Sequence, residues 1–227
     1  MTAKDMFSHR VSILTGHYRT GKTEVSVNLA LALAAEGEQV MLADLDIVNP
    51  YFRSRERRPL LEKAGVRVIS SSQACSDADV PALPAELLTI LENREIRGIL
   101  DIGGDPVGAR VLARFQPKIV QEDYQLIFVL NANRPEVRDA ESAAAYLRSI
   151  EAVTGLTCSG LVNNTHLCGE TTPAEIRKGA ALAQEVSRQT GIPILCHTAE
   201  RRFLESLSDL GEPVFPIAIN MKKPWER

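Results

Sequence analysis

The sequence predicts an α/β protein with three layers, in which helices cover both faces of a mainly parallel sheet. Short apolar segments, typical of buried strands, alternate along the chain with longer segments typical of helices. The first such pair is a strand expected at residues 10–14 and a helix expected at residues 24–35. Gly37 follows this helix and suits its C-terminal cap. A length of 227 residues favours a single domain spanning residues 1–227.

The composition is that of a globular protein, with 44% hydrophobic and 24% charged residues. A net charge of −3 and a pI near 5.9 argue against a general nucleic-acid binder, which usually has a basic excess. No apolar run approaches the roughly 20 residues of a membrane span. Residues 1–9 lack the apolar core of a signal peptide. We therefore expect a cytoplasmic protein without a membrane anchor and do not expect nucleic acid as a partner.

Four cysteines, Cys75, Cys158, Cys168 and Cys196, are scattered without a Cys-x-x-Cys spacing. In a reducing compartment such cysteines are expected to be buried thiols rather than disulfides or zinc ligands. His166 lies two residues before Cys168, so the two could share a metal ion. Two candidate ligands do not make a site, however, because a structural zinc ion needs four.

Residues 16–23 read Gly-His-Tyr-Arg-Thr-Gly-Lys-Thr and fit G-x-x-x-x-G-K-[ST], the phosphate-binding P-loop. The strand before it and the helix after it are the context that the motif needs. Unpaired N–H groups and partial positive charge at a helix start attract phosphate oxygens. We expect Lys22 to reach the β- and γ-phosphates and the Thr23 hydroxyl to bind Mg²⁺. The alternative is a glycine turn with a chance lysine. The nucleotide-contacting residues expected in this segment are Gly16, His17, Tyr18, Arg19, Thr20, Gly21, Lys22, Thr23 and Glu24.

Acidic residues follow two further predicted strands, at 39–43 and 98–101. The carboxyl ends of strands are where open α/β sheets bind ligands. We assign Asp44 to the Mg²⁺ shell and Asp46 to orienting the water that attacks the γ-phosphate, a catalytic role shared with Lys22. Asp101 ends an apolar run as in the Walker B element and would hold Mg²⁺ through water, so its strand should neighbour that of the P-loop. For each aspartate, a turn after the strand is the alternative.

The loop after Asp101 contains Gly103, Gly104 and Asp105. Its glycines allow it to bend near the γ-phosphate and to shift when that phosphate is lost. The arginine-rich residues 53–58 are interpreted as a solvated surface.

The rest of the chain continues the alternation. Strands are expected at 66–69, 126–130, 160–162, 192–196 and 215–219. Helices are expected at 85–93, from Pro135 to about 153, at 172–190 and at about 200–208. Residues 70–84 and 197–201 are expected to be loops, the second of them close enough to contact a base.

The order of these motifs, residues 16–23, then Asp44-x-Asp46, then Asp101-x-x-Gly-Asp105, resembles the MinD/ParA class of P-loop ATPases. That class, within the SIMIBI group, includes the nitrogenase iron protein and the ATP-using cobyrinic acid a,c-diamide and dethiobiotin synthetases. Residues 211–214, Gly-Glu-Pro-Val, are similar to the G-x-P-V ending of MinD-like proteins. The resemblance implies a Mg²⁺-dependent, slowly hydrolysing ATPase that works as a switch on a protein client, as a homodimer.

The P-loop departs from this class at its second residue. MinD-like loops read K-G-G-x-G-K-[ST], and their first lysine reaches the nucleotide of a dimer partner. His17 takes that place here, with Tyr18 and Arg19 where glycines are usual. Two interpretations stay open: His17 or Arg19 substitutes for the lysine, since arginine binds phosphate well, or His17 packs on its own loop.

The resemblance also assigns the adenine contact to Asn163, with Asn164 close behind it. An amide can donate to and accept from a base edge, although asparagine is also common in turns after strands. The sequence lacks Asn-Lys-x-Asp, the usual guanine-reading pattern, so ATP is favoured over GTP. Three other functions remain. One is a carboxylate-phosphorylating synthetase with Arg53, Arg55 and Arg134 as its basic residues. The others are a metal-insertion or redox-partner ATPase, and a module that binds nucleotide without turnover.

Overall fold

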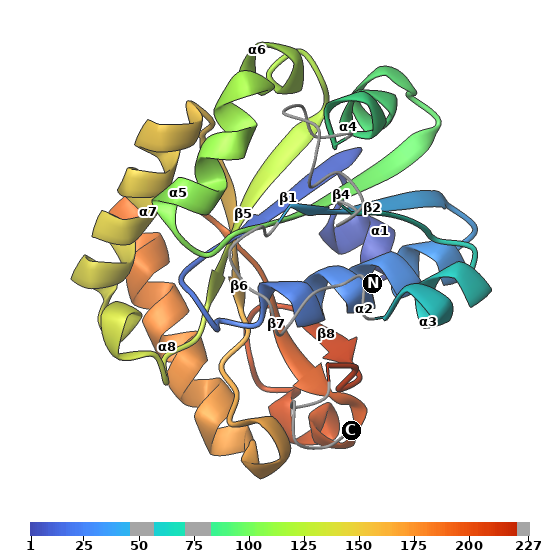
Figure 1. The fold of residues 1–227 in the computed structure, drawn as a ribbon. Helices are drawn as coiled ribbons and strands as arrows, with labels where there is room; N and C mark the ends of the chain where they lie inside the picture. Colours follow the sequence, from blue (N-terminus) through green and yellow to red (C-terminus); the bar gives the residue numbers. More distant parts are fainter. Residues whose placement is uncertain (46–56, 71–82, 222–227) are drawn as a thin grey trace.

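A computed structural model of the chain describes residues 1–45, 57–70 and 83–221 (Figure 1). Eight strands in these ranges form one sheet in the order β3-β2-β4-β1-β5-β6-β7-β8. All seven neighbouring pairs are parallel. The predicted parallel sheet is therefore confirmed. The strands are β1 (Val11–Thr15), β2 (Gln39–Leu45), β3 (Arg67–Ser70), β4 (Ile96–Ile102), β5 (Tyr124–Leu130), β6 (Cys158–Asn163), β7 (Ile194–Glu200) and β8 (Val214–Ile217).

Helices cover both faces of the sheet, which confirms the three-layer architecture. The first three lie on one face and the next five on the other (Figure 1). They are α1 (Ala3–Met6), α2 (Lys22–Ala35), α3 (Arg58–Lys63), α4 (Leu83–Glu92), α5 (Pro106–Ala109), α6 (Gln116–Ile119), α7 (Ala140–Thr154) and α8 (Pro173–Thr190). Short 3₁₀ turns join them: η3 (Arg110–Arg114), η4 (Pro135–Val137), η5 (Cys168–Glu170), η6 (Arg201–Phe203) and η7 (Glu205–Leu207).

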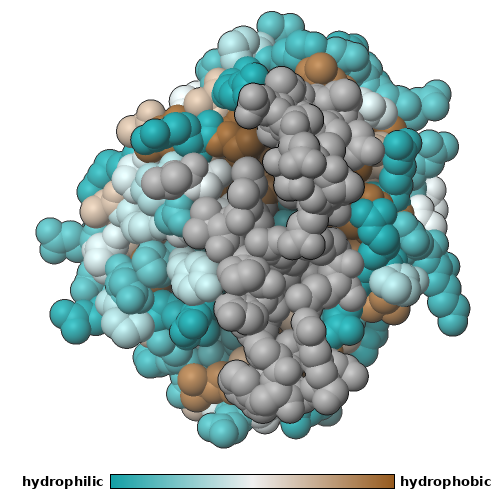
Figure 2. All heavy atoms as spheres, in the orientation of Figure 1, coloured by the Kyte–Doolittle hydropathy of each residue, from teal (hydrophilic) through white to brown (hydrophobic). Residues whose placement is uncertain are grey.

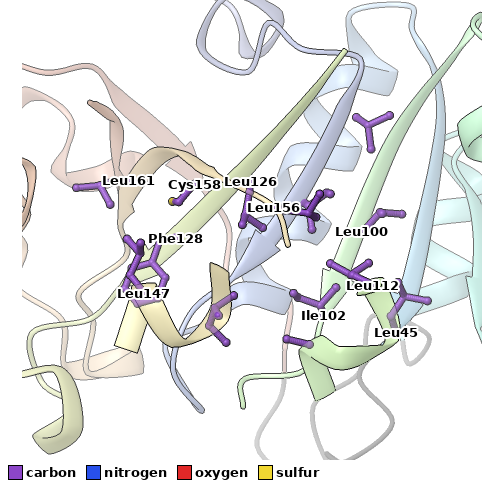
Figure 3. Packing of buried hydrophobic residues seen from close by; sticks show 14 of the residues in the cluster. Leu45, Leu100, Ile102, Leu112, Leu126, Phe128, Leu147, Leu156, Cys158 and Leu161 are labelled. Atoms are coloured by element: carbon purple, nitrogen blue, oxygen red, sulfur yellow. The ribbon is translucent and has the colours of Figure 1, made fainter. Parts of the chain in front are cut away.

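Two apolar cores result, because successive side chains of a strand point to opposite faces. In β4, Leu100 belongs to the core under α4, α7 and α8, whereas Ile99 belongs to the core under α1, α2 and α3. Figure 3 shows part of the first core, where Leu147 of α7 lies beside Phe128 of β5. Burial of such side chains stabilises the fold by about 25 cal/mol per Å² of apolar surface. Together the two cores fix the central strands, whose carboxyl ends all lie on the same side of the molecule.

The prediction that a helix begins at Pro135 is wrong. Pro135 begins the short turn η4, and α7 starts only at Ala140. The reason is the cap: Asp139 has an extended backbone, and its side chain accepts a hydrogen bond from the Ser142 N–H.

Two expectations for the C-terminal region are also wrong. The strand expected at 192–196 is β7, which runs on to Glu200 because residues 197–200 pair with β8. His197 is therefore not in a loop but buried, between the Asn163 amide and the Glu212 carboxylate. The helix expected at 200–208 is replaced by the turns η6 and η7.

Cys158 and Cys196 are buried free thiols, as predicted, and Cys168 is a half-buried one. In the part of the chain that the structure describes, no group of three or more His, Cys, Asp and Glu side chains could hold a metal ion, and no helix is long and apolar enough to span a membrane. The coloured surface in Figure 2 is mostly polar, with small, separate apolar patches. Several sequence-based predictions concern residues outside the described ranges, namely Asp46, Arg53, Arg55 and Cys75.

Candidate nucleotide site

The P-loop connects β1 to α2, and its backbone requires its two motif glycines. Gly16 has φ +139° and Gly21 has φ +89°, a region that side chains rarely adopt. A Cβ atom on Gly16 would collide with the Val129 carbonyl oxygen, and one on Gly21 would collide with the Asn164 amide. Arg19 also has a positive φ, at 62°. Positive φ angles at these three positions give the loop the tight backbone that a phosphate-binding loop needs.

Lys22 is the first residue of α2 and is 5% exposed. Its ammonium group donates to the His17 carbonyl oxygen at 3.2 Å. The same carbonyl accepts hydrogen bonds from the Thr20 N–H, at 3.2 Å, and from the Thr20 hydroxyl, at 2.9 Å. These bonds fold the loop around the start of a 14-residue helix, where phosphate is attracted. Lys22 therefore lies where the sequence analysis needs a phosphate-binding cation.

Two buried carboxylates lie at the same edge of the sheet. Asp44 of β2 and Asp101 of β4 are direct register partners, and Asp101 is also paired with Leu14 of β1. The predicted adjacency of the P-loop strand and the Asp101 strand is thus confirmed. Asp44 is 4% exposed and Asp101 is 1% exposed. Carboxylate and hydroxyl oxygens are suitable Mg²⁺ ligands, and with the half-buried Thr23 at the start of α2 the residues present fit this ion.

Glu24 and Asn28 are buried residues of the P-loop helix α2. Both are 8% exposed, and they bind the chain after β8. The Glu24 carboxylate accepts hydrogen bonds from the Asn220 and Met221 N–H groups, at 2.8 and 2.9 Å. Asn28 exchanges two hydrogen bonds with the Ala218 backbone. The Glu24 side chain thus anchors the C-terminal segment, while a nucleotide contact by this residue stays a prediction.

The side-chain amides of Asn163 and Asn164 bond within the protein. Asn163 donates to the Ile176 carbonyl at 3.0 Å and to His197 Nδ1 at 3.1 Å. Its oxygen accepts from the Thr165 N–H, as in a turn after a strand. Asn164 donates to the Thr20 carbonyl of the P-loop at 2.8 Å. The asparagines thus build the strand end and support the loop, and an adenine contact by either of them stays a prediction.

His166 is a residue of this site that the sequence analysis did not assign to the nucleotide. Its Nδ1 accepts a hydrogen bond from the Cys168 N–H at 3.3 Å, so its proton is on Nε2. Nε2 is buried, lies 3.1 Å from a Cβ built on Gly21, and has no hydrogen-bond partner among the described residues. Burial, and then the Arg134 charge, lowers the pKa of His166 to about 4. Its place three residues after Asn163, at a strand end beside the P-loop, is the signal that could have found it.

His166 and Asn164 line a small hollow at the carboxyl ends of β6, β7 and β8, with Glu200 and Ile219 on its other walls. Lys22 and the two aspartates lie on the opposite side of the P-loop, toward β4 and β2. The P-loop therefore lies between Lys22 and the two aspartates on one side and this hollow on the other.

The two unusual loop residues have different environments. The His17 ring packs edge-on against Tyr146 of α7, with centroids 4.9 Å apart, and His17 Nδ1 is 3.8 Å from Glu136 Oε2. Arg19 is exposed, and its carbonyl oxygen accepts a hydrogen bond from Arg134 Nε at 2.8 Å. The structure shows the His17 ring packed on α7, whereas a substitution of His17 or Arg19 for the lysine stays a prediction. A role of Arg19 toward a second subunit, and the homodimer itself, stay predictions.

No protein-family model matches this sequence, and neither does the sequence of any curated protein. Similar solved structures include the cell division protein FtsY of Thermotoga maritima, with TM-score 0.56 and 23% identity over 81% of this chain and 59% of that one. The 54 kDa signal recognition particle protein of Aeropyrum pernix K1, solved with GDP, has TM-score 0.53 and 25% identity over 82% and 40%. Chloroplast FtsY of Physcomitrella patens has TM-score 0.55 and 15% identity over 81% and 56%.

This chain thus spans 40% to 59% of the length of these three proteins. At such identities the comparisons bear on the fold, and none of the three is a MinD/ParA protein by name. They agree with the three-layer α/β/α architecture described above. The chain has the three-layer α/β/α fold of the nucleotide-binding, SIMIBI-class P-loop NTPases.

Proposed function

We propose that this chain is a Mg²⁺-dependent ATP-binding and slowly hydrolysing switch protein of the MinD/ParA class, which acts as a homodimer on a protein client. The observation that carries the proposal is the P-loop itself. Left-handed Gly21 caps α2, buried Lys22 is the first residue of that helix, and Asp101 lies on β4, the strand beside β1. A chance glycine turn has no reason to combine these three features.

Each group has a role in this proposal. Loop N–H groups and Lys22 hold the phosphates, and Thr23, Asp44 and Asp101 would hold Mg²⁺. When bound, the ion neutralises charge on the β- and γ-phosphate oxygens. The Asp46 carboxylate orients the attacking water, a role that rests on its sequence position two residues after Asp44. Loss of the γ-phosphate changes the loop after β4, and this change is read by the client.

GTP is the second candidate nucleotide, because the Aeropyrum pernix protein was solved with GDP. The sequence supports ATP, since the chain reads Asn-Asn-Thr-His at 163–166 and not Asn-Lys-x-Asp. Calorimetric titration of the protein with Mg·ATP and with Mg·GTP decides between them. A dissociation constant at least tenfold lower for GTP would replace ATP in the proposal.

The same titration tests the site through Lys22→Ala. Removing one partner of a buried charge contact costs about 2–5 kcal/mol, which corresponds to a roughly thirtyfold to several-thousandfold loss of affinity. Lys118→Ala is the matched control, because the Lys118 side chain is 51% exposed and pairs with Glu92 on the surface. Unchanged ATP binding by the Lys22 variant would refute the assignment.

The switch mechanism is tested by Asp46→Asn, which should block hydrolysis and trap the ATP-bound complex with its client. Copurification from the native host should then recover a protein that the wild type does not retain. ADP release that is stimulated by a small carboxylic acid would instead support a synthetase. That alternative has little structural support: Arg134 is committed to the Arg19 carbonyl, and the other two arginines lie outside the described ranges.

A further inference from the structure

The loop after β4 is fixed to the P-loop and to α7 by one tyrosine. The Tyr146 hydroxyl of α7 donates a hydrogen bond to the Gly104 carbonyl oxygen. The ring of the same tyrosine packs on His17, at 4.9 Å and 67°, and on Phe128 of the core, at 6.3 Å. Tyr146 thus contacts both loops that surround the Lys22 ammonium group.

Gly104 lies very close to the phosphate-binding lysine. A Cβ atom built on Gly104 would be 2.6 Å from Lys22 Nζ and 2.9 Å from the Tyr18 N and Cα atoms. Only a residue without a side chain can therefore bring its backbone this close. The γ-phosphate is the group that Lys22 and this loop would share, so a small displacement of Gly104 changes the space that the phosphate meets.

The tyrosine is suited to hold this position permanently. Burial raises the pKa of Tyr146 to about 12, and Asp105 adds to the effect, so the phenol remains a donor at neutral pH. Beyond Gly104 the loop continues in a tight turn, in which the Asp105 carboxylate accepts a hydrogen bond from the Gly108 N–H at 2.6 Å. Gly104 is thus held by α7 on one side and by this turn on the other.

We propose that Tyr146 is a positioning residue for the γ-phosphate: its hydroxyl holds Gly104 beside Lys22, so that the chain distinguishes a nucleoside triphosphate from a diphosphate. His17 gives the tyrosine ring its orientation, which assigns a role to the unusual second residue of the P-loop. This inference rests on the proposed nucleotide binding, and it concerns the terminal phosphate alone.

The test uses Tyr146→Phe, which keeps the ring against His17 and Phe128 and removes only the hydroxyl. Calorimetry compares Mg·ADP with the non-hydrolysable analogue Mg·AMP-PNP, or the guanine pair if the wild type prefers guanine. The loss of one hydrogen bond to a backbone carbonyl should weaken analogue binding roughly three- to tenfold and leave diphosphate binding unchanged within about twofold. Tyr124→Phe is the matched control, because Tyr124 is the first residue of β5 and lies at the amino ends of the strands, away from the P-loop.

A second measurement needs no nucleotide. Amide hydrogen exchange at residues 103–108 should be faster in Tyr146→Phe than in the wild type and in Tyr124→Phe. Equal weakening of both nucleotides, or unchanged exchange in this segment, would show that Tyr146 only packs, and would overturn the inference while nucleotide binding stands. If the wild type binds neither nucleotide, the proposed function fails and the inference fails with it.

Discussion

Glu24→Ala should release the C-terminal segment from the P-loop helix. The Glu24 carboxylate accepts three hydrogen bonds, from the Asn220 N–H, the Met221 N–H and the Asn28 side chain, at 2.8, 2.9 and 3.1 Å. Hydrogen bonds to a charged group contribute about 1.5–3 kcal/mol each. Burial raises the pKa of Glu24, which shows that desolvation opposes these bonds. We therefore expect a total loss of about 2–4 kcal/mol rather than the full sum.

Two assays check this prediction. Urea unfolding should show a lower free energy of unfolding, and amide exchange should become faster at Asn220 and Met221 by roughly thirtyfold or more. Glu185→Ala is the control, because Glu185 bonds only to neighbours on the exposed surface of α8 and should change stability little. Unchanged exchange at Asn220 and Met221 in Glu24→Ala would refute the anchoring role.

Further predictions concern titratable groups. His166 has a pKa of about 4 in the folded chain, well below its ordinary 6.5, so only the unfolded chain gains this proton as the pH falls. Stability should decline between about pH 6.5 and 4, by up to about 3 kcal/mol, and urea unfolding at several pH values should show a smaller decline for His166→Phe. Burial raises the pKa of Cys158 to about 12, so a thiol reagent at pH 8, followed by peptide mass spectrometry, should label half-buried Cys168 first and Cys158 only after unfolding.

The sequence was sufficient for the architecture because hydrophobic periodicity reports the local environment of each segment. The P-loop, the parallel alternation and the adjacency of β1 and β4 all follow from short, contiguous patterns. The main error lies where a segment distant in sequence determines the secondary structure. Residues 197–200 look like a loop alone, and they are a strand because β8 supplies hydrogen bonds. The start of α7 is a different case, because it depends on a local cap at Asp139.

The site was predictable only where its chemistry is contained in one motif. Lys22, Thr23 and Asp101 are identified by their spacing in the sequence. His166 and Tyr146 are not, since their importance comes from contacts with residues distant in sequence: Gly21 for His166, and Gly104 and His17 for Tyr146. Glu24 illustrates the same limit. An acid on a helix face is normally solvated, and only the return of the chain after β8 makes its surroundings buried.

The supports of the P-loop explain how its unusual sequence keeps the conformation that the proposed phosphate binding needs. Loop residues that are glycines in MinD-like proteins cannot rely on backbone freedom, so their conformation must be held from outside. Among these positions, the Arg19 carbonyl is bonded by Arg134. The rest of the loop is supported by Val129 against Gly16, Asn164 on Thr20 and Tyr146 on His17, all of them remote in sequence. A loop fixed in this way loses little conformational entropy when a ligand arrives, which favours affinity. The supports come from β5, the end of β6, the segment after β5 and α7, so phosphate binding should stabilise these elements together.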